Sequence, residues 1–243
     1  MNYKTPQLIV ALDVDTLEET RTLVNALSPA VDIFKVGSQL FTACGPAAVR
    51  FILSRGKKVF LDLKYHDIPN TVGNAVKTAV GLASAVSFQN EKQSLFMLTV
   101  HTVGGKDMLQ AAVKAAREKA PEMNLNKPLV VGITVLTSEE RNKNTLNLVV
   151  ERAVLAQEAG LDGIVASVEE AKMIRQKFGE DFVIVTPGIR PQGQEAGDQK
   201  RIATPAQAVL NGSNFLVVGR PIVASKGPLE VAQKILEEIN LAI

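Results

Sequence analysis

The sequence predicts an α/β protein of the (β/α)8 TIM-barrel class. Short apolar runs rich in Val, Ile and Leu recur eight times along the 243 residues. These runs are continuous rather than alternating, which is typical of parallel strands that are buried on both faces. Helix-like segments separate most of the runs, and eight such β/α units fit a closed barrel of this length.

The predicted elements follow one another in β/α order. We predict strands at residues 8–14, 33–37, 59–65, 95–101, 129–136, 163–167, 182–188 and 215–220. We predict helices at residues 16–27, 70–86, 106–120, 146–160 and 228–240. Val72, Val76 and Val80 repeat at helical spacing in the second helix, and Gly160 is suited to end the fourth.

An open, doubly wound sheet is the alternative architecture. That fold usually places a glycine-rich phosphate turn after its first strand, whereas here the first strand continues into LDVDTLEET without such a turn. We therefore favour the closed barrel. No change of composition divides the chain, so we expect residues 1–243 to form a single barrel domain.

The composition argues against several classes of function. Hydrophobic residues make up 46% of the chain, and a formal net charge of only +2 argues against a dedicated nucleic-acid surface. Cys44 is the one cysteine, so no intrachain disulfide is possible, and no cluster of histidines and cysteines suggests a metal site. No signal-peptide pattern and no apolar run of ~18 to 20 residues is present, so we expect a cytoplasmic protein without membrane contact.

Charged residues interrupt the apolar runs where the first three strands end. Asp13 belongs to the first predicted strand, Lys35 to the second, and Asp62 and Lys64 to the third. Residues two apart on a strand point to the same side, and barrel enzymes gather their active sites at the carboxyl ends of the strands. A structural ion pair is the alternative for Asp62 and Lys64, but charges on three strands at one level favour a functional site.

A second group of residues follows the seventh and eighth strands, where barrel enzymes often bind phosphate. TPGIR ends one strand and VGRP the other, which places Arg190 and Arg220 at the same end of the barrel. Arginine can grip phosphate with two hydrogen bonds, and Gly188 and Gly219 permit close approach of the backbone. The alternative is that both arginines are ordinary surface residues. The long polar segment 190–205 is predicted to be a functional loop that closes over the site.

Three further residues receive a structural interpretation. His66 is interpreted as a solvated loop residue. His101 could lie near the mouth of the barrel, but no nucleophile is paired with it. Cys44 is interpreted as a small core residue rather than a catalyst.

The segment DLKYHDIPNT (62–71) resembles the Asp-x-Lys-x-x-Asp-Ile-x-x-Thr signature of the orotidine 5′-phosphate decarboxylase family. ALDVD, FKVG, TVLTS, TPGIRP, GDQKR and VVGRPI also resemble that family and occur in its order. The length is similar to the stand-alone bacterial type. The resemblance implies the reaction of orotidine 5′-monophosphate (OMP) to uridine 5′-monophosphate (UMP) and CO2, the last step of de novo pyrimidine synthesis.

The resemblance also implies roles for individual residues. The implied catalytic network is Lys35, Asp62, Lys64 and Asp67, with Lys64 as the proton donor. The implied substrate-binding residues are Asp13, Lys35, Asp62, Thr71, Thr137, Arg190, Gln199, Gly219 and Arg220. Among these, Asp13 and Lys35 would hold the ribose, Thr137 would lie close to the pyrimidine, and the last four would close on the phosphate. Asp67 and Thr71 would reach into the partner's site, which implies a homodimer.

The implied reaction explains why charges are needed at the strand ends. Loss of CO2 leaves a carbanion at C6 that is not conjugated with the ring carbonyls. No cofactor motif is present, so we expect neither a metal nor an organic cofactor. A preorganised ammonium group in a water-poor pocket can stabilise the carbanion and then protonate it.

Two alternative functions remain open at this point. Mg2+-dependent enzymes such as 3-keto-L-gulonate 6-phosphate decarboxylase and hexulose-phosphate synthase share the Asp-x-Lys-x-x-Asp motif, but they resemble one another in placing an acidic metal ligand on the second strand. Lys35 on the second strand of this chain would repel Mg2+. A non-catalytic nucleotide-binding barrel is the other alternative. It would keep Arg190, Arg220 and Gln199 but need not keep Lys64 with both aspartates.

Overall fold

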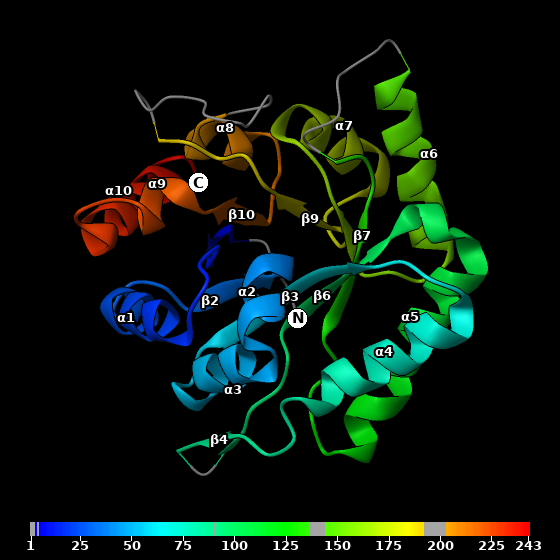
Figure 1. Cartoon of the computed structure of the whole chain (residues 1–243). Coiled ribbons are helices and arrows are strands. Elements are labelled where there is room, and N and C mark those ends of the chain that lie inside the picture. The colour runs from blue at the N-terminus through cyan, green and yellow to red at the C-terminus, as the bar shows by residue number, and fades with distance from the viewer. Residues whose placement is uncertain (1–2, 4, 90, 137–143, 192–202) are drawn as a thin grey trace.

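The computed structural model describes residues 3, 5–89, 91–136, 144–191 and 203–243. Within these residues, eight parallel strands close into a barrel that is surrounded by helices (Figure 1). The barrel strands are β1 (Gln7–Ala11), β2 (Ile33–Gly37), β3 (Lys58–Tyr65), β6 (Met97–His101), β7 (Leu129–Ile133), β8 (Gly163–Val165), β9 (Val183–Thr186) and β10 (Phe215–Val218). Each barrel strand pairs with its neighbours along the chain, and β10 pairs with β1 to close the ring. The predicted (β/α)8 fold is confirmed.

Helices follow the strands and cover the outside of the barrel (Figure 1). They are α1 (Leu17–Leu27), α2 (Ser38–Cys44), α3 (Pro46–Ser54), α4 (Pro69–Gly81), η1 (Thr102–Gly104), α5 (Gly105–Glu122), α6 (Thr145–Glu158), α7 (Val168–Phe178), α8 (Pro205–Leu210), α9 (Arg220–Val223) and α10 (Pro228–Leu241). The short strands β4 (Ser87–Phe88) and β5 (Glu91–Lys92) form a separate antiparallel pair, which the sequence analysis did not predict.

Alternate residues of the strands pack into two apolar cores. Ile9 and Ala11 of β1 face the inside of the barrel, where they join residues such as Phe60 and Phe215. Leu8 and Val10 face outward and pack against the helices. This alternation is the period of two that a strand requires, and burial on both faces explains why each strand reads as an unbroken apolar run.

Helix ends were predicted with mixed success. The start of α1 is defined by a capping box, in which the Glu19 backbone N–H donates to Thr16 Oγ1 at 3.1 Å. As predicted, α6 is followed by Gly160, which takes a φ of 83°. The prediction that the second helix extends over 70–86 was wrong, because α4 ends at Gly81. There the backbone switches to tighter bonds between residues three apart, as in Leu82 N–H to the Ala79 carbonyl.

Several strands are shorter than predicted at their carboxyl ends. The first was predicted to reach residue 14 but ends at Ala11, so Asp13 lies beyond the strand rather than on it. The fifth was predicted to reach residue 136 but ends at Ile133. Val135 and Leu136 continue the apolar run because they line a cavity rather than pair with a neighbouring strand.

Candidate active site

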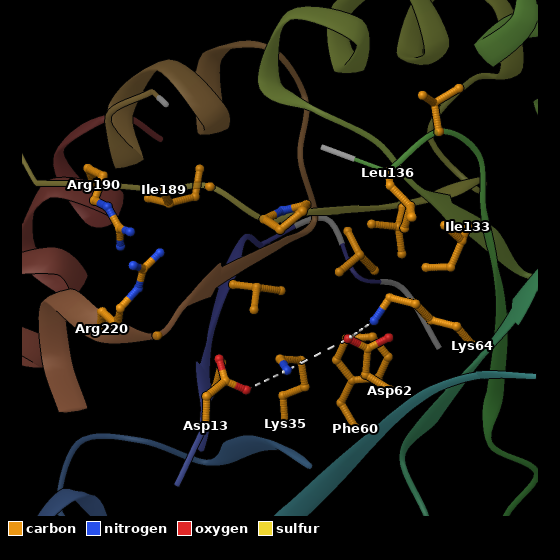
Figure 2. Close-up of a pocket in the computed structure, with 18 residues that line it drawn as sticks. Asp13, Lys35, Phe60, Asp62, Lys64, Ile133, Leu136, Ile189, Arg190 and Arg220 are labelled. Atoms are coloured by element: carbon orange, nitrogen blue, oxygen red, sulfur yellow. Dashed lines mark hydrogen bonds and ion pairs between the residues drawn. The ribbon is translucent and has the colours of Figure 1, made fainter. Parts of the chain in front are cut away.

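A cavity of about 220 Å3 opens at the carboxyl-terminal ends of the barrel strands. Among the described residues, the charged side chains that line it are Asp13, Lys35, Asp62, Lys64, Arg190 and Arg220. Figure 2 shows these side chains in two groups on opposite sides of the cavity. We call Asp13, Lys35, Asp62 and Lys64 the charged cluster, and Arg190 with Arg220 the arginine pair.

The charged cluster is a chain of alternating charges (Figure 2). Lys35 Nζ lies 3.2 Å from Asp13 Oδ1 and 3.7 Å from Asp62 Oδ2. Lys64 Nζ lies 2.8 Å from the same Asp62 oxygen. Asp62 therefore sits between two ammonium groups, and its side chain is only 12% exposed. Attraction between unlike charges is stronger around the largely buried Lys35 and Asp62 than in water, which favours one arrangement of these side chains.

An irregularity of β3 places Asp62 and Lys64. Leu61 pairs with Leu98 of β6 and Tyr65 with Val100, so residues 62–64 lie opposite the single residue Thr99. Lys64 takes a φ of 52°, which residues other than glycine adopt rarely. Its backbone N–H donates to Thr99 Oγ1 at 2.8 Å, and Thr99 Oγ1 donates to Asp62 Oδ1 at 3.0 Å. The alternation of a regular strand therefore does not account for the position of Lys64.

Two glycines leave space around the charged cluster. A Cβ atom at Gly37 would lie 2.8 Å from Lys35 Nζ, which is too close for the ammonium group to stay in place. A Cβ atom at Gly219 would lie 3.4 Å from Asp13 Oδ2 and from the Ala11 Cβ. Gly219 was among the predicted site residues, whereas the sequence analysis assigned no role to Gly37.

The arginine pair closes the opposite side of the cavity. Arg190 is buried, at 8% exposure, and Arg220 is the exposed first residue of α9. Their guanidinium groups point toward one another in Figure 2. Burial, and after it the positive charge of Arg220, lowers the pKa of Arg190. An anion between the two groups would offset both effects, which is the electrostatic setting of a phosphate site.

Apolar side chains form a wall along much of the remaining lining of the cavity. This wall includes Ile133, Val135, Leu136, Val165, Val185 and Val217. Such a surface favours the flat face of an uncharged ring and excludes water from it. The sequence analysis did not predict that these apolar residues line a cavity. The signal was the continuation of apolar runs such as LVVGITVL past the end of the strand.

Asp67 and Thr71, which the resemblance places in the site, do not line this cavity. Both are exposed, Asp67 in the turn before α4 and Thr71 in its first turn. The Asp67 carboxylate accepts a hydrogen bond from the Ile68 backbone N–H at 2.6 Å. Thr137 and Gln199 lie outside the described residues, as does most of the predicted closing loop 190–205.

The residues given a structural interpretation lie near the mouth of the barrel or on its outside. His66 is exposed, and its ring centroid lies 5.6 Å from that of His101. His101 ends β6, and its Nδ1 accepts a hydrogen bond from the Val103 backbone N–H. Cys44 is partly buried and packs against the outer core.

The described part of the chain holds neither a metal-ligand cluster nor a helix suited to span a membrane. In that part of the chain, no group of three or more His, Cys, Asp or Glu side chains is arranged to hold a metal ion. None of the helices found there has the length and apolar character that a bilayer span requires.

A closed (β/α)8 barrel with charged side chains at its mouth, and an arginine pair after its last two strands, defines an enzyme of the phosphate-binding barrel class. Residues 6–235 match the model of the "Orotidine 5'-phosphate decarboxylase / HUMPS family", and the chain belongs to that family. The resemblance inferred from DLKYHDIPNT is thereby confirmed.

Several proteins named orotidine 5′-phosphate decarboxylase are similar to this one over almost the whole chain. The one from Moorella thermoacetica is 47% identical, covering 97% of this chain and 92% of the relative. The one from Heliobacterium modesticaldum is 48% identical, covering 96% of this chain and 95% of the relative. The crystal structure of the Lactobacillus acidophilus protein superposes with a TM-score of 0.81 at 33% identity, covering 97% of this chain and 99% of that one.

Proposed function

We propose that this chain is a carboxy-lyase that converts OMP to UMP and CO2 in pyrimidine biosynthesis. Family membership and near full-length similarity to proteins of that name support this function. The observation that carries it is one cavity with an arginine pair on one side and an ammonium group aimed by a carboxylate on the other.

We also propose that residues 1–243 form one domain, since α10 near the C-terminus packs against β1 and α1 near the N-terminus. A cytoplasmic location stays a prediction from the sequence.

The geometry suggests how the substrate would bind. In our proposal the phosphate lies between Arg190 and Arg220, and the pyrimidine lies along the apolar wall with C6 toward Lys64. Asp13 and Lys35 would hold the ribose hydroxyls, because Asp13 lies beside Gly219 and therefore near the arginine pair. Binding energy from the remote phosphate can then be used to place the reacting ring.

The chemical step would use Lys64 twice. The bond between C6 and the carboxylate breaks, CO2 leaves, and the electron pair stays on C6. The Lys64 ammonium stabilises this pair and then gives it a proton, so UMP forms and Lys64 becomes an amine that regains a proton from solvent. Asp62 aims the ammonium through the 2.8 Å contact, and Lys35 offsets the charge of Asp62.

The Mg2+-dependent sugar-phosphate enzymes remain the alternative, because the family description covers more than one activity. Here the Lys35 ammonium lies between Asp13 and Asp62, and its positive charge would repel a divalent cation at these carboxylates. This geometry favours the metal-independent reaction. Turnover of OMP that survives EDTA would agree with it, whereas turnover of 3-keto-L-gulonate 6-phosphate with added Mg2+ would support the alternative.

The experiment that tests the function follows the ultraviolet absorbance of OMP as it becomes UMP, with EDTA-treated protein. Wild-type protein should turn over OMP, and Lys64→Ala should lower kcat by about 10^4-fold or more, because both the charge and the proton donor are lost. Lys106→Ala is the matched control, since Lys106 pairs with Glu158 away from the cavity. Well-folded wild-type protein without turnover would contradict the proposal.

We also propose a homodimer in which Asp67 and Thr71 serve the partner's cavity. Their exposure, and their absence from the lining of this chain's own cavity, support this arrangement. Lys64→Ala and Asp67→Asn homodimers should both be inactive. Mixing them in equal amounts should restore about a quarter of the wild-type activity, because half of the dimers then hold one intact site each.

Subunit exchange must be verified in the mixing experiment by native mass spectrometry with one variant carrying a tag. A mixture of tagged and untagged Lys64→Ala is the control and should stay inactive. If exchange is complete and activity does not return in the Lys64→Ala and Asp67→Asn mixture, Asp67 acts within its own chain and the shared site is wrong.

A further inference from the structure

Thr99 of β6 faces the irregular part of β3 from inside the barrel wall. Three residues of β3, Asp62 to Lys64, lie opposite this one residue in the pairing of the two strands. In a regular parallel pair, backbone groups of the neighbouring strand would bond the residues of β3 at even spacing. Here the extra residues cannot all find such partners. A side chain on β6 has to supply what the backbone does not.

The Thr99 hydroxyl bonds to both functional residues of β3. It accepts from the Lys64 backbone N–H at 2.8 Å and donates its own hydrogen to Asp62 Oδ1 at 3.0 Å. Thr99 has no solvent exposure, so water cannot replace either bond. A hydroxyl has one hydrogen to donate, and that hydrogen goes to the carboxylate. The two bonds link the position of the Lys64 backbone to the orientation of the Asp62 carboxylate.

Each bond restrains a group that would otherwise be free to move. The φ of 52° at Lys64 is unfavourable for a side chain and persists only where the surroundings hold it. The Asp62 carboxylate is held at both oxygens, by Thr99 at Oδ1 and by the two lysines at Oδ2. Its plane is therefore fixed, and with it the direction of the ammonium group that bonds to it.

We propose that Thr99 is a positioning residue for the decarboxylation, which sets the Lys64 ammonium against C6 by holding Lys64 and Asp62 as one unit. This inference rests on the proposed function. Thr99 does not itself line the cavity and meets the site only through Asp62 and Lys64, so its loss should leave ligand binding nearly intact and act on the chemical step. Misplacing a reacting group by ~1 Å is enough to slow a reaction by about a hundredfold.

The test compares Thr99→Val, which keeps the shape but removes the hydroxyl, with Thr99→Ser, which keeps the hydroxyl. We expect Thr99→Val to lower kcat for OMP by about ten- to hundredfold while the Kd for UMP, from calorimetry, changes by less than about threefold. Thr99→Ser should recover most of kcat. Thr20→Val is the matched control, because Thr20 is equally buried and loses a bond to the Thr16 carbonyl far from the cavity.

Several outcomes would overturn the proposal. One is a Thr99→Val enzyme with kcat within about threefold of wild type, and another is a loss of kcat that Thr99→Ser does not restore. A loss of UMP affinity in Thr99→Val as large as its loss of kcat would also overturn the proposal, because it would indicate a merely structural role. If Thr99→Val does not fold, Thr99→Ala against Thr99→Ser makes the same comparison. A crystal structure of the variant gives a readout independent of activity, since Lys64 unchanged at positive φ would contradict the proposal even if the wild type proved inactive on OMP.

Discussion

The two sides of the cavity differ in the signs of the charges that lie next to one another. The charged cluster alternates in sign, so each ammonium group has a carboxylate partner within the protein. The arginine pair holds two like charges near one another, and the pKa of Arg190 is lowered as a result of burial and of Arg220. Among the described lining residues, the acidic side chains are Asp13 and Asp62, both in the charged cluster.

This difference indicates what each side is built to meet. A balanced cluster is complete before substrate arrives and suits a charge that exists only briefly in the reaction. Two like charges side by side suit a permanent anion, because binding the anion relieves their repulsion. The charged cluster should therefore control kcat. The arginine pair should control substrate affinity and the binding energy that the phosphate supplies to the reaction. The following predictions separate the two sides.

Of the substitutions compared in these predictions, Asp62→Asn should lower kcat most after Lys64→Ala, because it removes the carboxylate that two ammonium groups share. We expect kcat to fall by about 10^3-fold or more, since Lys64 loses the carboxylate that aims it. The free energy of unfolding should also fall, by about 1 to 3 kcal/mol, because the lysines then repel one another in a half-buried site. Stopped-flow or steady-state absorbance and urea unfolding measure the two quantities.

Asp32→Asn is the control for Asp62→Asn. Asp32 pairs with Lys57 at 3.0 Å, but its side chain is 77% exposed, so both kcat and stability should stay close to wild type. If Asp62→Asn behaves like Asp32→Asn, the charged cluster is an ordinary surface arrangement and the comparison between the two sides fails.

Arg220→Ala should have the next largest effect, and only on a phosphorylated substrate. We expect kcat/KM for OMP to fall by about a hundredfold, because a charge-assisted bond to the phosphate is lost. For orotidine, which lacks the phosphate, the same substitution should change kcat/KM by less than about threefold. Both substrates are measured with wild type, Arg220→Ala and the exposed control Arg55→Ala. Equal losses for OMP and orotidine would show that Arg220 does not act through the phosphate.

Ligand-induced stabilisation should show the smallest effect and the cleanest separation. UMP at about 100 times its Kd should raise the Tm of wild type by about 5 to 10 °C, through binding to the folded state alone. Lys64→Ala should keep this shift, whereas Arg190→Ala should lose most of it at the same UMP concentration. Differential scanning fluorimetry measures the shifts, and the assignment of the arginine pair is wrong if Arg190→Ala responds as strongly as Lys64→Ala.

Much of the barrel could be predicted because its signals are local. Parallel strands buried on both faces produce apolar runs wherever they occur, and the order of runs and helices determines the topology. Strand ends were predicted less well. Val135 and Leu136 look like part of a strand because they are apolar, but they line the cavity and do not pair in the sheet. The predicted end of the second helix at residue 86 was wrong, because the helix stops at Gly81 and the tight turns that follow leave no periodic signal in the sequence.

The candidate site was predictable where charge interrupts an apolar run, as at Lys35, Asp62 and Arg190. It was not predictable where the arrangement depends on a partner far along the chain. Thr99 is one threonine in the run LFMLTVH. Only the pairing of β6 with β3 brings its hydroxyl to Lys64 and Asp62, which lie 35 and 37 positions earlier in the chain. The role of Gly37 likewise could not be predicted, because it depends on the Lys35 ammonium lying where a side chain at position 37 would be.

The most direct test of the central claim isolates the carbanion from the loss of CO2. UMP is incubated with the enzyme in D2O, and the C6 hydrogen is followed by proton NMR, because protonation of C6 by Lys64 must also run in reverse. The account predicts that wild type and Lys106→Ala exchange this hydrogen for deuterium and that Lys64→Ala does not. Equal exchange by Lys64→Ala, or none by a wild type that decarboxylates OMP, would contradict the role of Lys64 as the group that stabilises and protonates C6.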